Sequence, residues 1–259
     1  MTVSLTAYLR ACHCGPTVTV TVVGTALAVG SGRPWPQVVL VAVAVFAGQL
    51  SIGWSNDWID AARDKAAGRV DKPIPAGEAG RRGVGVAAVV ALAAAVLLSV
   101  VATSTGWAHI VAVAAGWWYN VHAKRTVLSP LPFALAFGLL VVFATVSPSW
   151  QMVAAGALLG VSAHITNVLP DLADDAATGV HGFPHRLGVR GATATALACL
   201  AAATGLLLTV FEHRPYLVGA LAVVGLISAA LSSRRRLFLF VQLAALVNVA
   251  VLLWTTSTT

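Results

Sequence analysis

The chain has 259 residues, a mean hydropathy of +0.86 and only 10% charged side chains, against about 25% in an average soluble domain. This composition excludes a single water-soluble domain, because the apolar residues come in successive blocks long enough to cross about 30 Å of hydrocarbon. The formal net charge of +7 does not indicate nucleic-acid binding, because the basic residues form short clusters between the apolar blocks instead of a continuous stripe.

Hydropathy predicts nine membrane-spanning helices. In chain order the apolar blocks cover 16–32, 36–57, 84–104, 107–122, 130–147, 150–170, 192–211, 215–232 and 237–255. The fourth block is the shortest and carries His109. Gly and Pro mark the joins, as at Ser147-Pro148 and Arg214-Pro215. We therefore expect one all-α integral membrane domain over residues 1–259.

The N-terminal segment carries one basic residue, Arg10, and no small-residue cleavage site follows the first apolar block. We therefore expect an uncleaved first helix instead of a signal peptide. The three cysteines, Cys12, Cys14 and Cys199, are too few and too poorly spaced for a disulfide framework or a zinc site. The segment Cys12-His13-Cys14 is expected to be an interfacial tail.

The basic residues indicate the orientation of the chain. With nine helices, the N-terminus and the connections after helices 2, 4, 6 and 8 share one side of the membrane, and that side holds 14 of the 16 basic residues. Only Arg33 and Arg214 fall on the opposite side. Because Lys and Arg accumulate on the cytoplasmic side, we expect a multi-pass protein of the inner (plasma) membrane with cytoplasmic loops at 65–83 and 176–191.

Eight of the nine acidic residues lie in two groups on this same side, after the second and sixth apolar blocks. Each group contains an Asn followed by Asp residues at i+4 and i+8. The first group is Asn56, Asp60 and Asp64, with Asp57 added; the second is Asn167, Asp171 and Asp175, with Asp174 added. The matched positions are offset by 111 residues, which indicates a parallel internal duplication. The first segment also contains Asp71 and Glu78, and Glu78 is expected to pair with Arg81 or Arg82.

Positions i, i+4 and i+8 lie on one face of a helix, so each group would present a column of oxygen ligands. Stacked carboxylates repel one another, and a divalent cation removes that repulsion. Hard oxygen ligands suit Mg²⁺, which is commonly shared between carboxylates and a substrate phosphate. Two facing columns therefore predict a diphosphate clamped through metal ions, with the active site on the cytoplasmic side. The alternative is that the carboxylates pair with neighbouring Lys and Arg on solvated loops.

These motifs resemble those of the UbiA superfamily of intramembrane prenyltransferases. The segment 56–64, NDWIDAARD, matches without gaps the NDxxDxxxD motif expected after the second helix, and KPIPAG at 72–77 is similar to the signature that follows it. The segment 171–175 matches the second Asp-rich motif, and GFPHRLG at 182–188 resembles its tail but lacks the Thr often found before the Pro. The resemblance covers essentially the whole chain and implies a bundle of about nine helices around a central cavity.

The family also implies a Tyr and a Lys in the connection after the fourth helix. This chain has Tyr119 and Lys124 there, with four residues between them where three are common. On a continuous helix that spacing would turn Lys124 about 140° away from Tyr119. Either the helix ends near His122 or one of the two roles has moved.

The resemblance assigns roles to three overlapping sets of residues. The implied Mg²⁺ ligands are Asn56, Asp57, Asp60, Asp64, Asn167, Asp171 and Asp175. The implied diphosphate contacts are Asn56, Arg69, Lys72, Lys124, Asn167 and Arg186. The residues expected to act in catalysis are Asp60, Asp64, Asp171, Lys72, Tyr119 and Lys124.

Five aromatic residues lie next to the acidic segments in the sequence: Trp54, Trp58, Trp117, Trp118 and Tyr119. Trp and Tyr at helix ends commonly form an interfacial belt, which is the expectation for most of them. Trp118 and Tyr119 are the candidates for a different role, because aromatic faces stabilise cations.

The implied reaction is Mg²⁺-dependent transfer of an isoprenyl group from a prenyl diphosphate to a small acceptor, through an allylic carbocation in an intramembrane cavity open to membrane lipid. A terpene cyclase on the same scaffold, which needs no acceptor, is the alternative. A transporter is more remote, because transport sites usually lie near the bilayer midplane, often between inverted repeats. An aromatic acceptor is the commonest case in the family and is expected here. The prenyl chain length and the oligomeric state stay open.

Overall fold

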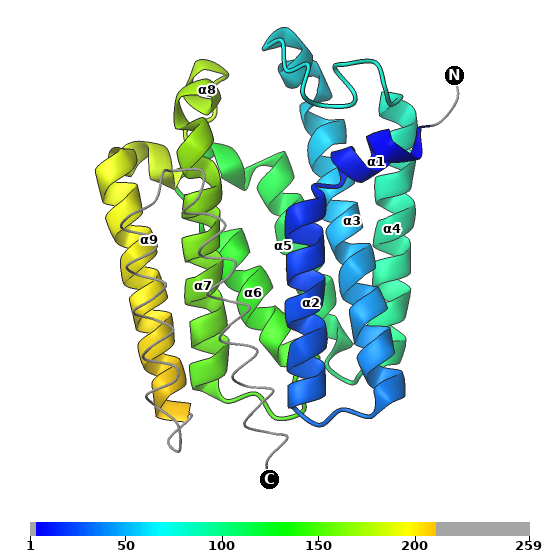
Figure 1. Cartoon of the computed structure of the whole chain (residues 1–259), viewed down its shortest axis with the longest axis vertical. Helices are drawn as coiled ribbons and strands as arrows, with labels where there is room; N and C mark the ends of the chain where they lie inside the picture. The colour runs from blue at the N-terminus through cyan, green and yellow to red at the C-terminus, as the bar shows by residue number, and fades with distance from the viewer. Residues whose placement is uncertain (1–3, 211–259) are drawn as a thin grey trace.

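The computed structural model describes residues 4–210, which fold into helices and turns without any strand in that range (Figure 1). The α-helices are α1 (Leu5–Ala11), α2 (Cys14–Gly30), α3 (Trp35–Ala66), α4 (Arg81–Ala102), α5 (Gly106–Val121), α6 (Leu131–Ala144), α7 (Trp150–Val168), α8 (Leu172–Ala177) and α9 (Phe183–Val210). Two 3₁₀ turns connect them, η1 (Ala123–Arg125) after α5 and η2 (Leu169–Asp171) after α7.

Seven of the nine predicted apolar blocks have a helix in the structure: α2 to α7 and α9. By length and composition four segments qualify as membrane spans: Trp35–Ala66, Arg81–Ala102, Trp150–Ala177 and Phe183–Val210. The pair α1 and α2, bent by 69°, makes a fifth if it is one broken span, and α6 is a shorter apolar helix. The last two predicted blocks, 215–232 and 237–255, lie outside the described residues, so the count of nine stays a prediction.

The bundle is held by apolar side chains between α2, α3 and α6. Val41 and Val45 on α3 pack with Leu27 on α2 and Phe143 on α6 in one buried cluster. At the same end of the bundle, Arg33 donates hydrogen bonds to the carbonyl oxygens of residues 143–145, which lie at the C-terminal end of α6, where the helix itself supplies no further donors. One of the two basic residues predicted on the opposite side of the membrane therefore serves as a helix cap.

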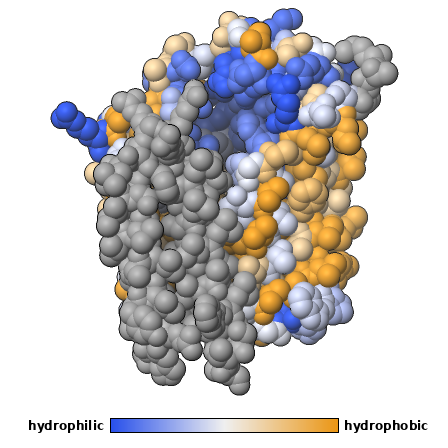
Figure 2. Space-filling view, in the orientation of Figure 1, coloured by the Kyte–Doolittle hydropathy of each residue, from blue (hydrophilic) through white to orange (hydrophobic). Residues whose placement is uncertain are grey.

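The other end of the bundle gathers the polar residues (Figures 1 and 2). Helix α8 and the segment 67–80 after α3 both lie at this end, and α1 lies across it. A hollow surrounded by hydrophilic residues opens there, while the side of the bundle below it is hydrophobic. The chain is non-helical over 67–80, within the predicted loop 65–83, and over 178–182, within the predicted loop 176–191.

Helix α1 is fixed over the segment 67–80 by Arg10. The two terminal nitrogens of Arg10 bind Oε2 of Glu78, at 2.6 Å, and the carbonyl oxygen of Asp71, at 2.7 Å. Glu78 therefore pairs with Arg10, 68 positions away, and the expected pairing with Arg81 or Arg82 was wrong.

The corner between α1 and α2 packs directly on the backbone of α3 at Gly53. A Cβ atom at this position would overlap the carbonyl oxygen of Cys12. Because a backbone carbonyl cannot rotate away, we expect Gly53→Ala to destabilise the protein by about 1–3 kcal/mol. The control is Gly205→Ala on α9, where a Cβ meets no atom of residues 4–210 within 4 Å and the higher helix propensity of Ala would add about 0.5–1 kcal/mol. Thermal unfolding of both variants in one detergent measures the difference; equal melting temperatures would contradict this packing.

Candidate active site

The first acidic group lies on a single helix. Helix α3 continues nine residues beyond the predicted apolar block and ends before Gly68, whose positive φ of 68° terminates it. Asn56, Asp60 and Asp64 therefore share one face of α3, as the sequence predicted. Asp57, Asp60 and Asp64 are all at most 3% exposed. These carboxylates are buried and are not part of a solvated loop.

Three cations surround the buried carboxylates. Nζ of Lys124 lies 2.6 Å from both oxygens of Asp60, and Nη2 of Arg63 lies 2.9 Å from Oδ2 of the same carboxylate. Nζ of Lys72 bridges Oδ1 of Asp57, at 3.1 Å, and Oδ2 of Asp64, at 2.8 Å. Three basic side chains therefore balance the charge of the three carboxylates. Pairing with Lys and Arg was one of the two expectations, but it was expected on solvated loops, and here it occurs in the protein interior.

Lys72 and Arg69 reach the site from the segment 67–80. Burial opposes the charge on Lys72, but the carboxylates of Asp57 and Asp64 outweigh it and raise the pKa of its ammonium group. Arg69 is held by Asp71, with Nε and Nη2 at 2.9 and 2.8 Å from its two carboxylate oxygens. This bidentate contact raises the pKa of Arg69. Both side chains line the cavity described below.

The second acidic group is not one helical column. Asn167 is on α7, Asp171 ends the 3₁₀ turn η2, and Asp175 is on α8. The interruption follows from Pro170, which has no N–H to continue the α-helical hydrogen bonds. Within residues 4–210, Asp171 and Asp175 form no ion pair with any basic side chain. The two groups therefore differ, because the first is paired with cations and the second is not.

The spacing of Tyr119 and Lys124 is resolved by the end of α5. The helix stops at Val121, His122 caps it, and η1 turns the chain so that Lys124 points back to Asp60. The first alternative in the sequence analysis therefore holds, and both residues line the same cavity. The ring of Tyr119 packs edge-on against Phe133, with ring centroids 5.0 Å apart, and against His164, at 5.4 Å.

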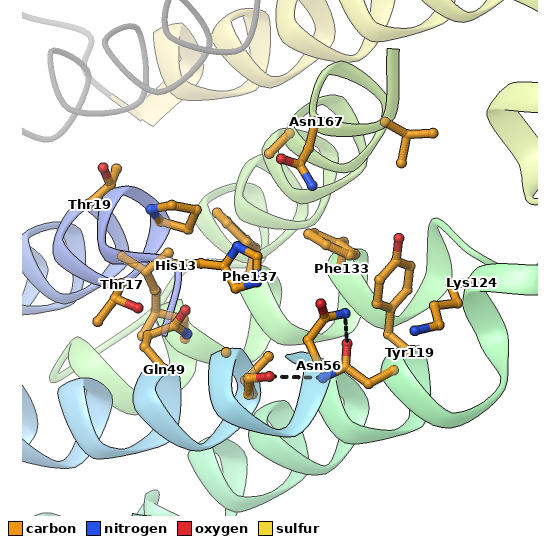
Figure 3. Close-up of a pocket in the computed structure, with 18 of the residues that line it drawn as sticks. His13, Thr17, Thr19, Gln49, Asn56, Tyr119, Lys124, Phe133, Phe137 and Asn167 are labelled. Carbon is orange, nitrogen blue, oxygen red and sulfur yellow. Dashed lines mark hydrogen bonds between the residues drawn. The ribbon is translucent and has the colours of Figure 1, made fainter. Parts of the chain in front are cut away.

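These residues meet in one cavity of about 410 Å³ between α2, α3, α5, α6 and α7. Its polar end is lined by both acidic groups and by Arg63, Arg69, Lys72 and Lys124. Asn56 and Asn167 enter it from opposing helices (Figure 3). Its other end is apolar and is lined by Val20, Val23, Leu27, Leu140, Val141 and Met152.

Some residues named by the sequence analysis lie outside this cavity. Asp57 does not line it and instead contacts Lys72 and His13. Arg186 is exposed on α9 and does not line it either. Of the aromatic residues considered, only Tyr119 lines the cavity. Trp54 and Trp117 donate hydrogen bonds to the carbonyl oxygen of Tyr8 and to Ser51 Oγ, so they pack between helices.

The structure also brings in residues that the sequence analysis missed or treated differently. His13, expected in an interfacial tail, lines the cavity at the break between α1 and α2, with Nε2 3.3 Å from Oδ1 of Asp57. Phe133 and Phe137 on α6 and Asn120 on α5 line it as well. The apolar pattern of α6 gave no signal that Phe133 and Phe137 would line the cavity. A polar Asn120 beside Tyr119 in an apolar helix was such a signal.

The donor set suits a hard cation together with an anion. Amide and carboxylate oxygens of both acidic groups face one cavity, and such oxygens are the ligands that Mg²⁺ prefers. The buried Nε and Nη1 of Arg63 find no hydrogen-bond acceptor within residues 4–210, so they are available to an anion. No three acidic, His or Cys side chains in this range already surround one point. The side chains at the polar end of the cavity therefore fit the Mg²⁺ and the diphosphate that the motifs imply.

Comparison with known proteins agrees with these features. The sequence model of the UbiA prenyltransferase family matches residues 17–239 of this chain. A UbiA homologue from Archaeoglobus fulgidus, solved bound to GPP and Mg²⁺, superposes with a TM-score of 0.77 at 16% identity, covering 98% of this chain and 100% of that one. The apo structure of a UbiA homologue from Aeropyrum pernix gives 0.76 at 20% identity, covering 93% and 98%.

A digeranylgeranylglyceryl phosphate synthase also superposes, with a TM-score of 0.74 at 15% identity over 98% of this chain and 99% of that one. No curated protein sequence matches the chain. The solved structures establish the fold, and the family match spans most of the sequence, including both acidic groups. The chain therefore belongs to the UbiA prenyltransferase family and is a prenyltransferase, as its motifs predicted.

Proposed function

We propose that the protein transfers an isoprenyl group from a prenyl diphosphate to a small acceptor in a Mg²⁺-dependent reaction. The observation that carries this proposal is the polarity of the cavity: acidic and basic side chains line one end, and aliphatic and aromatic side chains line the other. A prenyl diphosphate has matching ends, because its diphosphate head is charged and its isoprenoid tail is apolar. The Mg²⁺ and GPP bound to the Archaeoglobus fulgidus homologue support the assignment.

At the polar end, the proposed metal-facing oxygens belong to Asn56, Asp60 and Asp64 on one wall and to Asn167, Asp171 and Asp175 on the other. When bound, Mg²⁺ would neutralise the diphosphate and make it a better leaving group. Lys72, Lys124, Arg69 and Arg63 would hold the phosphate oxygens and stabilise the charge that grows as the bond to carbon breaks. Arg63 has buried N–H groups available for this contact.

Below the charged end, the cavity wall suits an allylic cation. The rings of Tyr119, Phe133 and Phe137 line this region (Figure 3), and aromatic faces attract positive charge without acting as nucleophiles. The aliphatic side chains beyond them exclude water from the tail. We place the tail there, with the polar end of the cavity on the cytoplasmic side of the inner membrane, where the basic residues of the sequence gather.

The acceptor is expected to be aromatic, and the rival activity is cyclisation of the prenyl diphosphate without acceptor. One experiment tests both: purified protein is given geranyl, farnesyl or geranylgeranyl diphosphate and Mg²⁺, with and without a panel of aromatic acceptors, and products are identified by mass. We expect a product of acceptor plus prenyl mass and release of diphosphate. A cyclised hydrocarbon formed without acceptor would favour the cyclase instead. Consumption of no prenyl diphosphate under any condition would contradict both.

A further inference from the structure

Asn120 on α5 is buried beside Asn56 in the cavity wall, at 2% exposure. Its hydrogen bonds to α3 determine which way the neighbouring side-chain amide of Asn56 faces.

Both N–H bonds of Asn120 are used on α3. Ser55 Oγ donates its only proton to the carbonyl oxygen of Ile52, at 2.9 Å. Nδ2 of Asn120 donates to the same carbonyl, at 2.9 Å, and to Ser55 Oγ, at 2.8 Å. A carbonyl oxygen only accepts, and the Ser55 proton is already committed. The atom of Asn120 that faces Ile52 must therefore be the nitrogen.

The orientation of Asn56 follows from this arrangement. Oδ1 of Asn120 can only accept, and it receives a hydrogen bond from Nδ2 of Asn56 at 3.2 Å. Rotating the Asn56 amide by half a turn would place two carbonyl oxygens against each other, with no proton between them. Oδ1 of Asn56 is thus left on the far side of the amide, at the edge of the cavity, where no hydrogen bond holds it within residues 4–210 (Figure 3).

We propose that Asn120 is a positioning residue that locks the Asn56 amide with its oxygen toward the metal and diphosphate. This inference rests on the proposed function, since it supposes a cation at the polar end of the cavity. Mg²⁺ is bound by oxygen and repelled by an amide NH₂ group. Without the lock, Asn56 could present either group. Residues that orient a metal ligand typically change metal affinity about 10–100-fold when they are replaced.

The test measures metal binding separately from turnover. The melting temperature of the detergent-solubilised protein is followed as Mg²⁺ is titrated in the presence of an unreactive geranyl thiolodiphosphate. For Asn120→Ala we expect the half-saturating Mg²⁺ concentration to rise about 10-fold or more. Asn120→Ser should raise the half-saturating Mg²⁺ concentration by the same factor, because the Ser hydroxyl is too short to reach Asn56. This variant replaces Asn120→Ala in the test if Asn120→Ala does not fold. Ser51→Ala is the matched control, because Ser51 accepts a buried hydrogen bond from Trp117 on α5 away from the cavity.

A second substitution separates the lock from general packing. In Asn56→Asp the carboxylate has two oxygens and no donor, so one oxygen would face Oδ1 of Asn120 and repel it. Adding Asn120→Ala removes that repulsion, and a carboxylate needs no orienting partner. We therefore expect Asn120→Ala to weaken Mg²⁺ binding in the wild-type background and to strengthen it in the Asn56→Asp background.

The outcomes are distinguishable. If Asn120→Ala and Asn120→Ser only lower the melting temperature, as Ser51→Ala does, and leave the Mg²⁺ midpoint unchanged, Asn120 is structural and this inference is overturned. The inference is also overturned if Asn120→Ala changes the Mg²⁺ midpoint in the same direction in the wild-type and in the Asn56→Asp backgrounds. If the wild-type protein itself shows no Mg²⁺-dependent stabilisation with the thiolodiphosphate, the proposed function fails, and the inference fails with it.

Discussion

Asp171→Asn is expected to lower kcat/KM for a prenyl diphosphate about 10³-fold while leaving the fold intact. Metal-ion stabilisation of a diphosphate leaving group is worth several kcal/mol, and each 1.36 kcal/mol is a factor of about ten in rate. Asp171 lines the cavity but is exposed and forms no ion pair within residues 4–210. Its replacement therefore removes a proposed metal ligand without removing a contact that stabilises the protein.

The matched control for this substitution is Asp174→Asn. Asp174 is also acidic and exposed in the same segment, but it does not line the cavity. We expect near wild-type turnover from this variant and unchanged melting temperatures from both. Equal activities of the two variants would show that the second acidic group acts only through its overall charge.

Lys124→Met should affect both catalysis and stability. Removing one preorganised donor from a developing oxyanion typically costs about 10²–10³ in kcat. Lys124 also neutralises Asp60, which is 2% exposed. Arg63 remains 2.9 Å from Oδ2 of Asp60, so we expect a loss of about 1–3 kcal/mol in unfolding free energy instead of complete unfolding.

Arg125→Met provides the control, because Arg125 is the next residue in η1 and is exposed. We expect kcat from steady-state kinetics and the melting temperature of this variant to stay close to those of the wild-type protein. The double variant Lys124→Met with Asp60→Asn separates the two effects: stability should return toward wild type, because no buried charge is left without its partner, while activity stays low. Recovery of activity in the double variant would contradict a role for Lys124 at the diphosphate.

The first acidic group could be predicted from the sequence because it depends on local geometry alone. An Asn and two Asp at intervals of four residues lie on one face wherever the helix is continuous, and α3 is continuous to Ala66. The same spacing failed for the second group, since Pro170 interrupts the helix between Asn167 and Asp171. Here the side chains still reach the same cavity, but from three consecutive elements, α7, η2 and α8, instead of one column.

Contacts between distant segments could not be read from spacing. Glu78 is close in sequence to Arg81 and Arg82, yet it binds Arg10, because α1 folds across the end of the bundle. The break between α1 and α2 likewise brings His13 to Asp57. Neither the bend nor its direction follows from hydropathy. The orientation of Asn56 depends on a hydrogen-bond network between α3 and α5, which requires the packed structure.

Equilibrium binding of a radiolabelled geranyl thiolodiphosphate tests most directly whether both acidic groups hold one diphosphate through Mg²⁺. We expect the wild-type protein to bind this unreactive analogue with Mg²⁺ and to bind it at least about 100-fold more weakly in EDTA, since the metal contributes several kcal/mol. Asp171→Asn should lose the Mg²⁺ effect, and Asp174→Asn should keep it. Equal affinity with Mg²⁺ and with EDTA in the wild-type protein would contradict the account.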